Sequence, residues 1–361
     1  MSSFHIVKHN EIKNKSFRVA QLYDQFDLAE NQFDEVFDGD ITPPQDWNIG
    51  VIVGKSGTGK TTIAKELFGD YFTKFEYSAD CVVDDFDKSI SSSELFGVLS
   101  SVGFSSPPSW LKPYAVLSNG EKMRVDLARA ILQKQDIIIF DEYTSVVDRE
   151  VAQIGSFALS KSVRRQGKKF IAVTCHYDII DWLEPDWVFY TDTMEMKFTR
   201  GSVRRPKIDI EVREIKGFWP MFAKYHYLNH SHSLTAREFV AFYNNKPIAF
   251  CSFIHFPHNK YKDMQKGHRL VVMPDYQGIG LGTKLNNLVA EEISKSSNYV
   301  GITTSINAFA KSFMHDPKWQ IVRAGHAALN GNMKSLNKSV SSNRNTYSFR
   351  YIPKGKSATN V

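Results

Sequence analysis

Residues 54–61 read Gly54-Lys55-Ser56-Gly57-Thr58-Gly59-Lys60-Thr61, and this stretch decides the fold of the first half of the chain. It follows the apolar run Ile49–Val53 and opens a helical segment. Its glycines let backbone N–H groups converge on an anion at the N-terminus of that helix, which is how phosphate groups are bound. A glycine-rich turn without a ligand is the alternative. We expect residues 54–61 and Thr62 to contact a nucleotide, with Lys60 at the β- and γ-phosphates and the Thr61 hydroxyl on Mg²⁺.

A second apolar strand, Ile137–Phe140, ends in two carboxylates, Asp141 and Glu142. We expect Asp141 to hold Mg²⁺ through water, and Glu142 to orient or deprotonate the water that attacks the γ-phosphate. An apolar strand that ends in acids is common by itself, so this prediction depends on the motifs around it. The short apolar runs alternate with helical stretches up to about Tyr190, a pattern typical of a parallel sheet with crossover helices.

Three further motifs accompany the glycine-rich stretch and the acid pair. Leu117-Ser118-Asn119-Gly120-Glu121 resembles the signature motif of ABC-type ATPases, Ser145–Asp148 resembles their D-loop, and Thr174-Cys175-His176 matches their switch histidine. The resemblance implies ATP and Mg²⁺ as ligands and a head-to-tail homodimer. In that dimer Ser118 and Gly120 of one copy cap the γ-phosphate held by the other copy. It also places Asp148 at the nucleotide and makes His176 the sensor of the γ-phosphate.

The match to this family departs at three points. Asn119 stands where Gly or Thr is usual, and no glutamine lies between Lys60 and Ser118, so the Q-loop has no direct counterpart; Asp84 or Asp85 is a candidate substitute. The interval is also shorter than in transporter ATPases. We therefore expect an ATPase that acts without a membrane partner.

A second glycine-rich turn, Gln277-Gly278-Ile279-Gly280-Leu281-Gly282, follows the strand His268–Val272 and precedes a helix. A strand, an anion-binding turn and a helix predict a second phosphate site built from backbone donors. The motif resembles the pyrophosphate loop of GNAT-family N-acetyltransferases. The resemblance to that family covers roughly residues 208–325. The resemblance implies acetyl-CoA, or a related acyl donor, bound by Val271, Val272, Gln277, Gly278, Ile279, Gly280, Leu281, Gly282, Thr283 and Asn307.

The catalytic groups of that family are not all present. Phe313 and Met314 stand where a tyrosine usually serves as general acid, and no glutamate lies on the strand before the loop, which carries His268 and Arg269 instead. The cluster Lys224–Leu228, followed by His230 and His232, adds aromatic and imidazole side chains suited to base stacking and proton transfer. Metal binding by its histidines, or packing into the core, are the alternatives. The predicted catalytic residues of the transferase are His268, Arg269, His226 and Tyr227.

These motifs predict an α/β chain in which an N-terminal ABC-type P-loop ATPase domain precedes a GNAT-like α+β acyltransferase domain. The expected bounds are 1–200 for the first domain, 201–207 for a basic linker, 208–353 for the second domain and 354–361 for a frayed tail. Within the first domain, Phe4–Ile41 predicts a small antiparallel sheet, and in the second Asn244–Pro247 predicts a hairpin turn.

The net charge of +6 over 361 residues conceals a division. Residues 1–200 hold 22 Lys and Arg against 30 Asp and Glu, whereas residues 201–361 hold 23 against 9. The second segment is thus suited to a polyanion such as DNA or RNA, although a basic surface without a partner is the alternative. Three scattered cysteines and the lack of a signal peptide or membrane-spanning run predict a cytoplasmic protein without disulfides.

The Tyr-His-Tyr element and the His-Arg-Leu-Val-Val strand also resemble phage Mom-type GNAT proteins, which modify adenine in DNA. The order of the motifs resembles a family of ABC-type ATPases fused to a predicted acetyltransferase. We therefore expect an ATP-regulated transferase that acts on a nucleic-acid base. An ATPase suits such a transferase, because a base must be unstacked before it can react, at a cost of a few kcal/mol. Two alternatives stay open: a nucleotide-gated protein or small-molecule acetyltransferase, and an ATP-dependent nucleic-acid clamp without transferase activity.

Overall fold

The computed structural model describes residues 3–9, 12, 16–26, 34–72, 75–199, 208–226, 230–326 and 345–353. The contacts divide the chain into two compact units. Unit 1 comprises residues 1–76 and 129–205, and unit 2 comprises residues 77–128 and 206–361. The expected linker at 201–207, the expected tail at 354–361 and Tyr227 lie outside the described residues.

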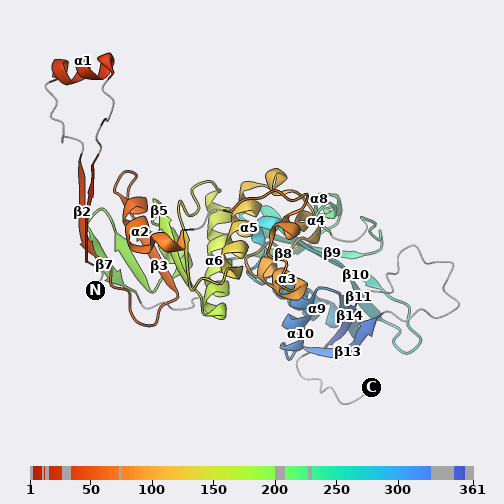
Figure 1. Ribbon diagram of the computed structural model, residues 1–361. Helices are drawn as coiled ribbons and strands as arrows, with labels where there is room; N and C mark the ends of the chain where they lie inside the picture. Colours follow the sequence, from red (N-terminus) through yellow and green to blue (C-terminus); the bar gives the residue numbers. More distant parts are fainter. Residues whose placement is uncertain are drawn as a thin grey trace. The chain divides into compact units, whose positions relative to one another are not determined.

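Unit 1 is built on a five-stranded sheet in the order β4-β5-β3-β6-β7 (Figure 1). The strands β3 (Ile49–Val53), β4 (Ile137–Phe140), β5 (Lys169–Thr174) and β6 (Trp187–Tyr190) are parallel, and β7 (Glu195–Phe198) is antiparallel to β6. Every residue of β3 is buried, which is why that segment reads as an unbroken apolar run. Helices α2 (Lys60–Phe68), α6 (Arg149–Gln166) and α7 (Ile179–Leu183) connect these strands, with a 3₁₀ turn at Gly69–Tyr71.

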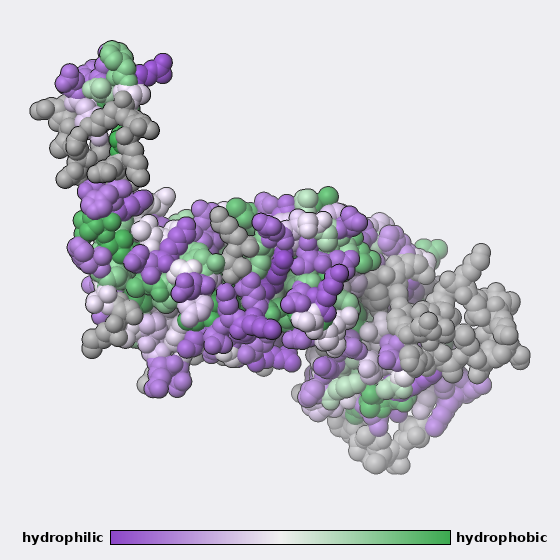
Figure 2. All heavy atoms as spheres, viewed as in Figure 1, coloured by the Kyte–Doolittle hydropathy of each residue, from purple (hydrophilic) through white to green (hydrophobic). Residues whose placement is uncertain are grey.

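A two-stranded antiparallel sheet precedes β3, as the sequence predicted. It pairs β1 (Ser3–Lys8) with β2 (Glu35–Asp40), and Phe4, Ile6 and Phe37 are buried in the unit 1 core. Between the two strands lies helix α1 (Phe17–Phe26), which the sequence reasoning missed. None of its residues is buried, and apolar side chains show at its surface in Figure 2.

The second sheet has seven strands in the order β13-β14-β12-β11-β10-β9-β8 (Figure 1). These are β8 (Glu211–Glu214), β9 (Arg237–Tyr243), β10 (Lys246–His255), β11 (Met264–Val272), β12 (Tyr299–Thr304), β13 (Trp319–His326) and β14 (Asn345–Tyr351). Among the strand pairs of the described residues in this sheet, β11–β12 is parallel and the others are antiparallel. The predicted hairpin joins β9 to β10, and Asn244 and Asn245 supply the two positive φ angles that such a short turn needs.

Four helices and turns accompany this sheet. They are α8 (Trp219–Ala223), the 3₁₀ turn η4 (Pro274–Tyr276), α9 (Leu281–Ser294) and α10 (Asn307–Met314). Trp219 and Phe222 of α8 pack in a cluster with Val240 and Phe250 of the sheet. Cys251, the next residue along β10, contacts Asn286 of α9, so α8 and α9 lie on opposite faces of the sheet.

Unit 2 also contains the segment that leads to the signature motif. It consists of the 3₁₀ turn η2 (Val82–Asp85), α3 (Ser92–Ser101), α4 (Pro107–Trp110), the 3₁₀ turn η3 (Tyr114–Val116) and most of α5 (Asn119–Leu132). The sequence assigned this segment, residues 77–128, to the first domain, whereas its contacts group it with the second sheet. The expected domain bounds stay a prediction, because compactness and sequence motifs divide the chain differently.

Candidate functional site

The phosphate-binding turn of unit 1 has the backbone that its glycines permit. Gly57 and Gly59 adopt φ angles of 85° and 78°, and Gly59 precedes the first residue of α2. A Cβ at Gly59 would lie 2.4 Å from the ring of Phe37, so both the backbone angle and the packing require glycine there. Lys60 donates a hydrogen bond to the carbonyl of Lys55 at 2.5 Å, which folds its side chain back over the turn.

The two predicted magnesium ligands lie together. The hydroxyl of Thr61, in the first turn of α2, donates to Oδ1 of Asp141 at 3.1 Å. Asp141 follows β4 directly, and Glu142 next to it adopts a left-handed φ of 50° while its N–H bonds Asp141 Oδ1 at 2.9 Å. A hydroxyl and a carboxylate are the oxygen ligands that Mg²⁺ prefers, so these residues fit the ion that an ATPase needs.

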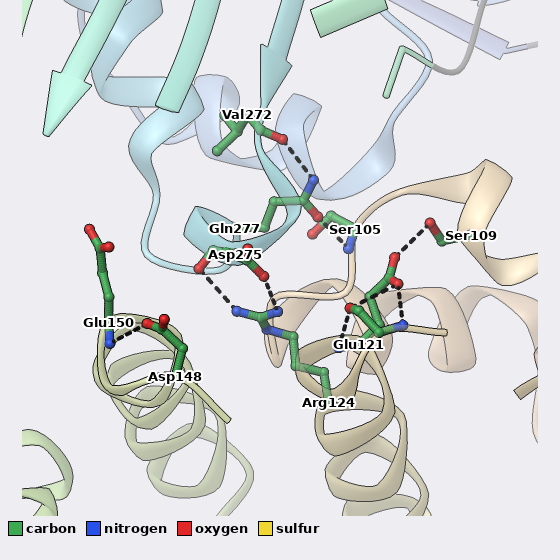
Figure 3. Close-up of polar contacts among 10 residues, drawn as sticks. Ser105, Ser109, Glu121, Arg124, Asp148, Glu150, Val272, Asp275 and Gln277 are labelled. Carbon is green, nitrogen blue, oxygen red and sulfur yellow. Dashed lines mark hydrogen bonds and ion pairs between the residues drawn. The ribbon is translucent and has the colours of Figure 1, made fainter. Parts of the chain in front are cut away.

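Further polar groups line the same end of the unit 1 sheet. Asp192 accepts hydrogen bonds from the Tyr177 hydroxyl and from Lys55 N–H, which together hold the pKa of that carboxyl below its usual range. His176 follows β5. Burial and, to a smaller extent, the nearby charge of Arg149 lower the pKa of its imidazole. Asp148 caps helix α6 by accepting from Glu150 N–H at 2.9 Å (Figure 3). Thus Lys60, Thr61 and Asp141 lie in one unit with Glu142, Asp148 and His176.

The signature motif lies in unit 2, at the start of α5. Ser118 and Glu121 bond each other reciprocally: Ser118 N–H and Oγ donate to Glu121 Oε2 at 3.0 and 3.1 Å, and Glu121 N–H donates back to Ser118 Oγ. This is a capping box, which fixes the first turn of the helix. Ser109 donates to the other oxygen of Glu121 at 3.0 Å (Figure 3). The candidate Q-loop residue Asp85 instead accepts from Ser78 and Ala79 N–H in a local turn.

The second glycine-rich turn stands between β11 and α9 in unit 2. Gly278 and Gly280 have φ angles of 86° and 83°, and a Cβ built on Gly280 meets nothing within 4 Å. The turn is therefore open on the side of that glycine. Because the first N–H groups of a helix have no partner inside it, the N-terminus of α9 directs donors and a positive dipole end into this space. Among the described residues here, 277, 278, 279, 282 and 283 are half-buried, Gly280 is exposed and Leu281 is buried.

Beside this turn, β11 and β12 part. The two strands pair only over Met264–Lys266 and Tyr299–Gly301, and no pairing continues toward Val272 and Thr304. Residues 267–272 therefore have one edge that β12 does not cover. On the other edge, β11 carries a β-bulge, because Arg269 pairs with Ser252 and Gly267 pairs with Phe253. His268 is the extra residue of that bulge, a feature that re-aims side chains next to active sites.

A buried polar cluster surrounds the bulge. The Nε2 atom of His232 lies 3.1 Å from Ser252 Oγ, and its Nδ1 lies 3.6 Å from Glu238 Oε1. His232 also stacks on Trp219 and lies 5.2 Å from the His268 ring, centroid to centroid. Burial is the main reason that the pKa values of both histidines are lowered, to about 4 for His268.

The sequence reasoning missed Glu238 and Ser252 in this cluster. Both are buried, at 6% and 0% exposure. The available signal was Glu238 itself, a carboxylate directly before the apolar run 239–243, because an acid at the start of a buried strand needs a partner. His232 stood in the predicted histidine cluster but was not among the residues predicted to be catalytic.

The other predicted transferase residues have varied surroundings. His226 is 6% exposed and packs edge-on against Trp219. Arg269 donates to the Ser231 carbonyl at 2.7 Å and so holds the loop that carries His232. Phe313 is fully buried among Phe309, Trp319 and Phe349, whereas Asn307 at the start of α10 is exposed.

Comparisons with known families place the two motif sets in two families. The ABC transporter family model matches residues 92–145, and the acetyltransferase (GNAT) family model matches residues 178–315. The chain combines an ABC-type ATPase region with a GNAT-like region. The first part of the GNAT match covers β6 and β7, which belong to the sheet of the ATPase region; the GNAT-like sheet itself begins at β8.

Two sequence relatives each match a part of the chain. The mRNA export factor elf1 of Schizosaccharomyces pombe is 35% identical over 122 residues, which are 27% of this chain and 11% of that protein. The lipoprotein-releasing system ATP-binding protein LolD 1 of Caulobacter vibrioides is 40% identical over 62 residues, or 17% of this chain and 26% of that protein. The chain thus spans about a quarter or less of the length of the curated relatives it matches.

Two solved structures resemble parts of the fold. The dimeric ABC transporter cassette MJ0796 aligns with a TM-score of 0.35 and 16% identity over 43% of this chain and 87% of that chain. The ribosomal-protein-S18-alanine N-acetyltransferase from Escherichia coli aligns with a TM-score of 0.31 and 14% identity over 42% of this chain and 99% of that one. Within the described ranges, we find no helix whose length and apolar content would let it span a membrane.

Proposed function

We propose that the chain is an ATP-dependent acyltransferase that uses an acyl-CoA donor and modifies a base in DNA or RNA. The parting of β11 and β12 beside the Gly278–Gly280 turn is the observation that carries this proposal. The open edge of β11 can pair with the amide groups of an extended pantetheine arm, and the turn with the α9 N-terminus suits the pyrophosphate of CoA. This arrangement orients the thioester toward the bulge at His268.

The transfer itself needs a proton acceptor. The acceptor amine attacks the thioester carbonyl carbon, a C–N bond forms, the C–S bond breaks, and the CoA thiolate leaves. The amine proton must pass to a base, and the thiolate takes up a proton from solvent. We assign the base to the His232–Glu238 pair, because Glu238 faces Nδ1 of His232 and favours its protonated form. Arg269 positions the loop of His232.

Two features favour a nucleic acid as the acceptor. Residues 201–361 hold 23 Lys and Arg against 9 Asp and Glu, more than one CoA molecule needs. The unit 2 sheet also has a hollow of about 390 Å³ lined by His258, Tyr261, Tyr299, Arg350 and four neighbours. The Arg350 guanidinium lies over the rings of Tyr261 and Tyr299, a combination suited to stacking of a base.

The hollow and the bulge at His268 are close enough for one nucleic-acid strand to reach both. Met264 lines the hollow and His268 lies four residues along the same strand, which is about 13 Å at ~3.3 Å per residue. A nucleic-acid strand can therefore stack one base in the hollow while a neighbouring base reaches the transfer site. ATP supplies the closure that holds it there: the signature motif of one copy and the phosphate-binding turn of a second copy share the nucleotide.

A second candidate function is favoured by one residue. Phe313, which stands where the GNAT family usually has its general acid, is fully buried and cannot protonate a thiolate. A nucleotide-gated nucleic-acid clamp that binds no acyl-CoA would not need such a group. The two functions differ in whether CoA binds at all.

Labelled acetyl-CoA tests the proposal. We would incubate the full chain with ATP, Mg²⁺ and either DNA or RNA, and then separate protein from nucleic acid. Label in the nucleic acid, lost in His232→Gln and in Lys60→Ala, supports the proposal. Label found only in protein would contradict a nucleic acid as the acceptor. If no label is transferred and calorimetry detects no CoA binding, the nucleic-acid clamp is favoured. The matched control is His255→Gln, a histidine at the last residue of β10 whose Nε2 contacts the Lys262 carbonyl.

A further inference from the structure

Within unit 2, the second glycine-rich turn, Gln277–Gly282, contacts residues 77–128, which lead to and include the signature motif. We call the turn the acyl-CoA turn, after its proposed ligand, and residues 77–128 the signature segment. Oε1 of Gln277, the first residue of the turn, accepts a hydrogen bond from Ser105 N–H at 2.7 Å, while its Nε2 donates to the Val272 carbonyl at 2.9 Å (Figure 3). Gln277 therefore links the end of β11 to the loop between α3 and α4.

Arg124 of α5 makes the second attachment. Its side chain is 1% exposed, its Nη2 donates to the Asp275 carbonyl at 3.0 Å, and its Nη1 lies 3.5 Å from Asp275 Oδ1 (Figure 3). Asp275 lies in η4, two residues before Gln277. A buried guanidinium held by a carbonyl and a carboxylate fixes the position of that turn, because moving either partner would leave a buried charge poorly solvated.

The backbone comes close at the same place. Gly103 adopts a φ of 90°, and a Cβ built on it would lie 2.8 Å from the Gln277 carbonyl oxygen and 3.3 Å from Arg124 Nε. Both the backbone angle and the close approach require glycine. Three residues of the signature segment, Gly103, Ser105 and Arg124, thus meet the residues that form the acyl-CoA turn.

The same helix carries the signature serine. Ser118 caps α5 through Glu121, and Arg124 follows six residues later, about 9 Å along the helix axis at ~1.5 Å per residue. Fewer than two helical turns therefore separate the group expected at the nucleotide from the group that holds the acyl-CoA turn. Over so short a stretch a capped helix moves as one rigid element. A displacement of the N-terminus of α5 would therefore also displace Arg124.

We infer that Arg124 is a positioning residue through which the nucleotide state sets the affinity for the acyl donor. This inference rests on the proposed function, since it assigns both ligands as proposed there. When ATP is captured at Ser118, the first turns of α5 are held, and Arg124 with Ser105 holds Asp275 and Gln277 in the conformation that binds pyrophosphate. Binding coupling is reciprocal, so the acyl donor raises the affinity for ATP by the same factor.

Hydrogen exchange of the full chain tests the coupling without the acyl donor. In the Glu142→Gln background, which keeps ATP intact, we expect ATP with Mg²⁺ to slow amide exchange over residues 275–283 at least fivefold. Arg124→Lys should remove that slowing, because lysine cannot reach both Asp275 oxygens as a fork. Lys122→Met, on the same helix and with its ammonium over Tyr114, should keep it. Unchanged exchange on adding ATP overturns the inference, as does slowing that persists in Arg124→Lys.

A second variant protects the test against loss of folding. Asp275→Asn leaves the carbonyl contact in place and removes only the charge of a side chain that is 48% exposed. We expect it to reduce the ATP effect and leave the unfolding temperature nearly unchanged; a full ATP effect would count against the inference. Calorimetry with CoA then separates the two claims. No CoA binding in any nucleotide state refutes the proposed transferase, whereas the exchange rates alone decide whether the nucleotide is coupled to the turn.

Discussion

The hydroxyl of Thr61 donates a hydrogen bond to Oδ1 of Asp141 at 3.1 Å, although 80 residues separate them in the sequence. The parallel sheet creates this contact, because β3 leads into the turn before α2 and β4 ends at Asp141 on the same edge. A hydroxyl and a carboxylate are oxygen ligands of the kind that Mg²⁺ prefers, and we propose that this pair holds the magnesium ion of bound ATP.

Thr61→Ala should weaken the Mg²⁺ dependence of ATP hydrolysis. The proposed role implies that one oxygen ligand is lost, and we expect the Mg²⁺ concentration for half-maximal hydrolysis to rise by at least the roughly 10- to 100-fold that losing a group behind a metal ligand costs. Thr61→Ser keeps the hydroxyl and serves as the matched control. Equal Mg²⁺ titrations for Thr61→Ala and the wild type would show that Thr61 is not a ligand.

Glu142→Gln should stop hydrolysis and trap an ATP-bound dimer. The substitution keeps the shape of the side chain at its left-handed backbone position but removes the base, which typically contributes about 10² to 10⁴ in rate. Phosphate release and size-exclusion chromatography with ATP measure the two effects. Glu150→Gln, in the first turn of α6, is the control. Normal hydrolysis by Glu142→Gln would disprove the role of that residue.

The stability of unit 2 should fall below about pH 6.5 because of His268. Burial lowers the pKa of this imidazole to about 4, so the unfolded chain binds a proton at a higher pH than the folded chain does. The contribution of this group to the free energy of unfolding then falls as the pH drops from 6.5 toward 4, and the loss levels off below pH 4. His268→Gln keeps an acceptor for Ser233 N–H but does not titrate.

Denaturant titrations at pH 7.5 and pH 5 compare the two proteins. The wild type should lose more stability between these pH values than His268→Gln does. An equal loss in both would mean that His268 is not held in its neutral form in the folded protein.

Gly280→Val should abolish the binding of CoA. The substitution places a branched side chain in the open turn and forces it toward a left-handed φ, at a cost of about 1–2 kcal/mol. Calorimetry should show at least a 100-fold loss of CoA affinity, while ATP binding in unit 1 stays normal. Gly217→Val, another positive-φ glycine of unit 2 with open space around it, controls for the backbone strain. Undiminished CoA affinity in Gly280→Val would remove the turn from the binding site.

The sequence predicted the parts of both regions that local motifs determine. Both glycine-rich turns, the acid pair after β4 and the β9–β10 hairpin follow from residues close in the chain. In the two turns and the hairpin the left-handed φ angles fall on Gly and Asn, which adopt them most readily. The two families were confirmed by the family models.

Long-range contacts accounted for what the sequence did not reveal. Glu238, Ser252 and His232 meet only because two strands and a loop fold together, and no spacing in the chain relates them. The grouping of residues 77–128 with the second sheet has the same cause. It depends on Arg124 and Ser105 contacting residues about 150 to 170 positions away.

The most direct test of base modification is mass spectrometry of nucleosides. DNA and RNA would be isolated from cells that produce the wild type, Lys60→Ala or Gly280→Val, and digested to nucleosides. We predict an acylated nucleoside that is present with the wild type and absent with both variants. Identical nucleoside profiles in all three, with each protein folded and present at the same level, would contradict the account.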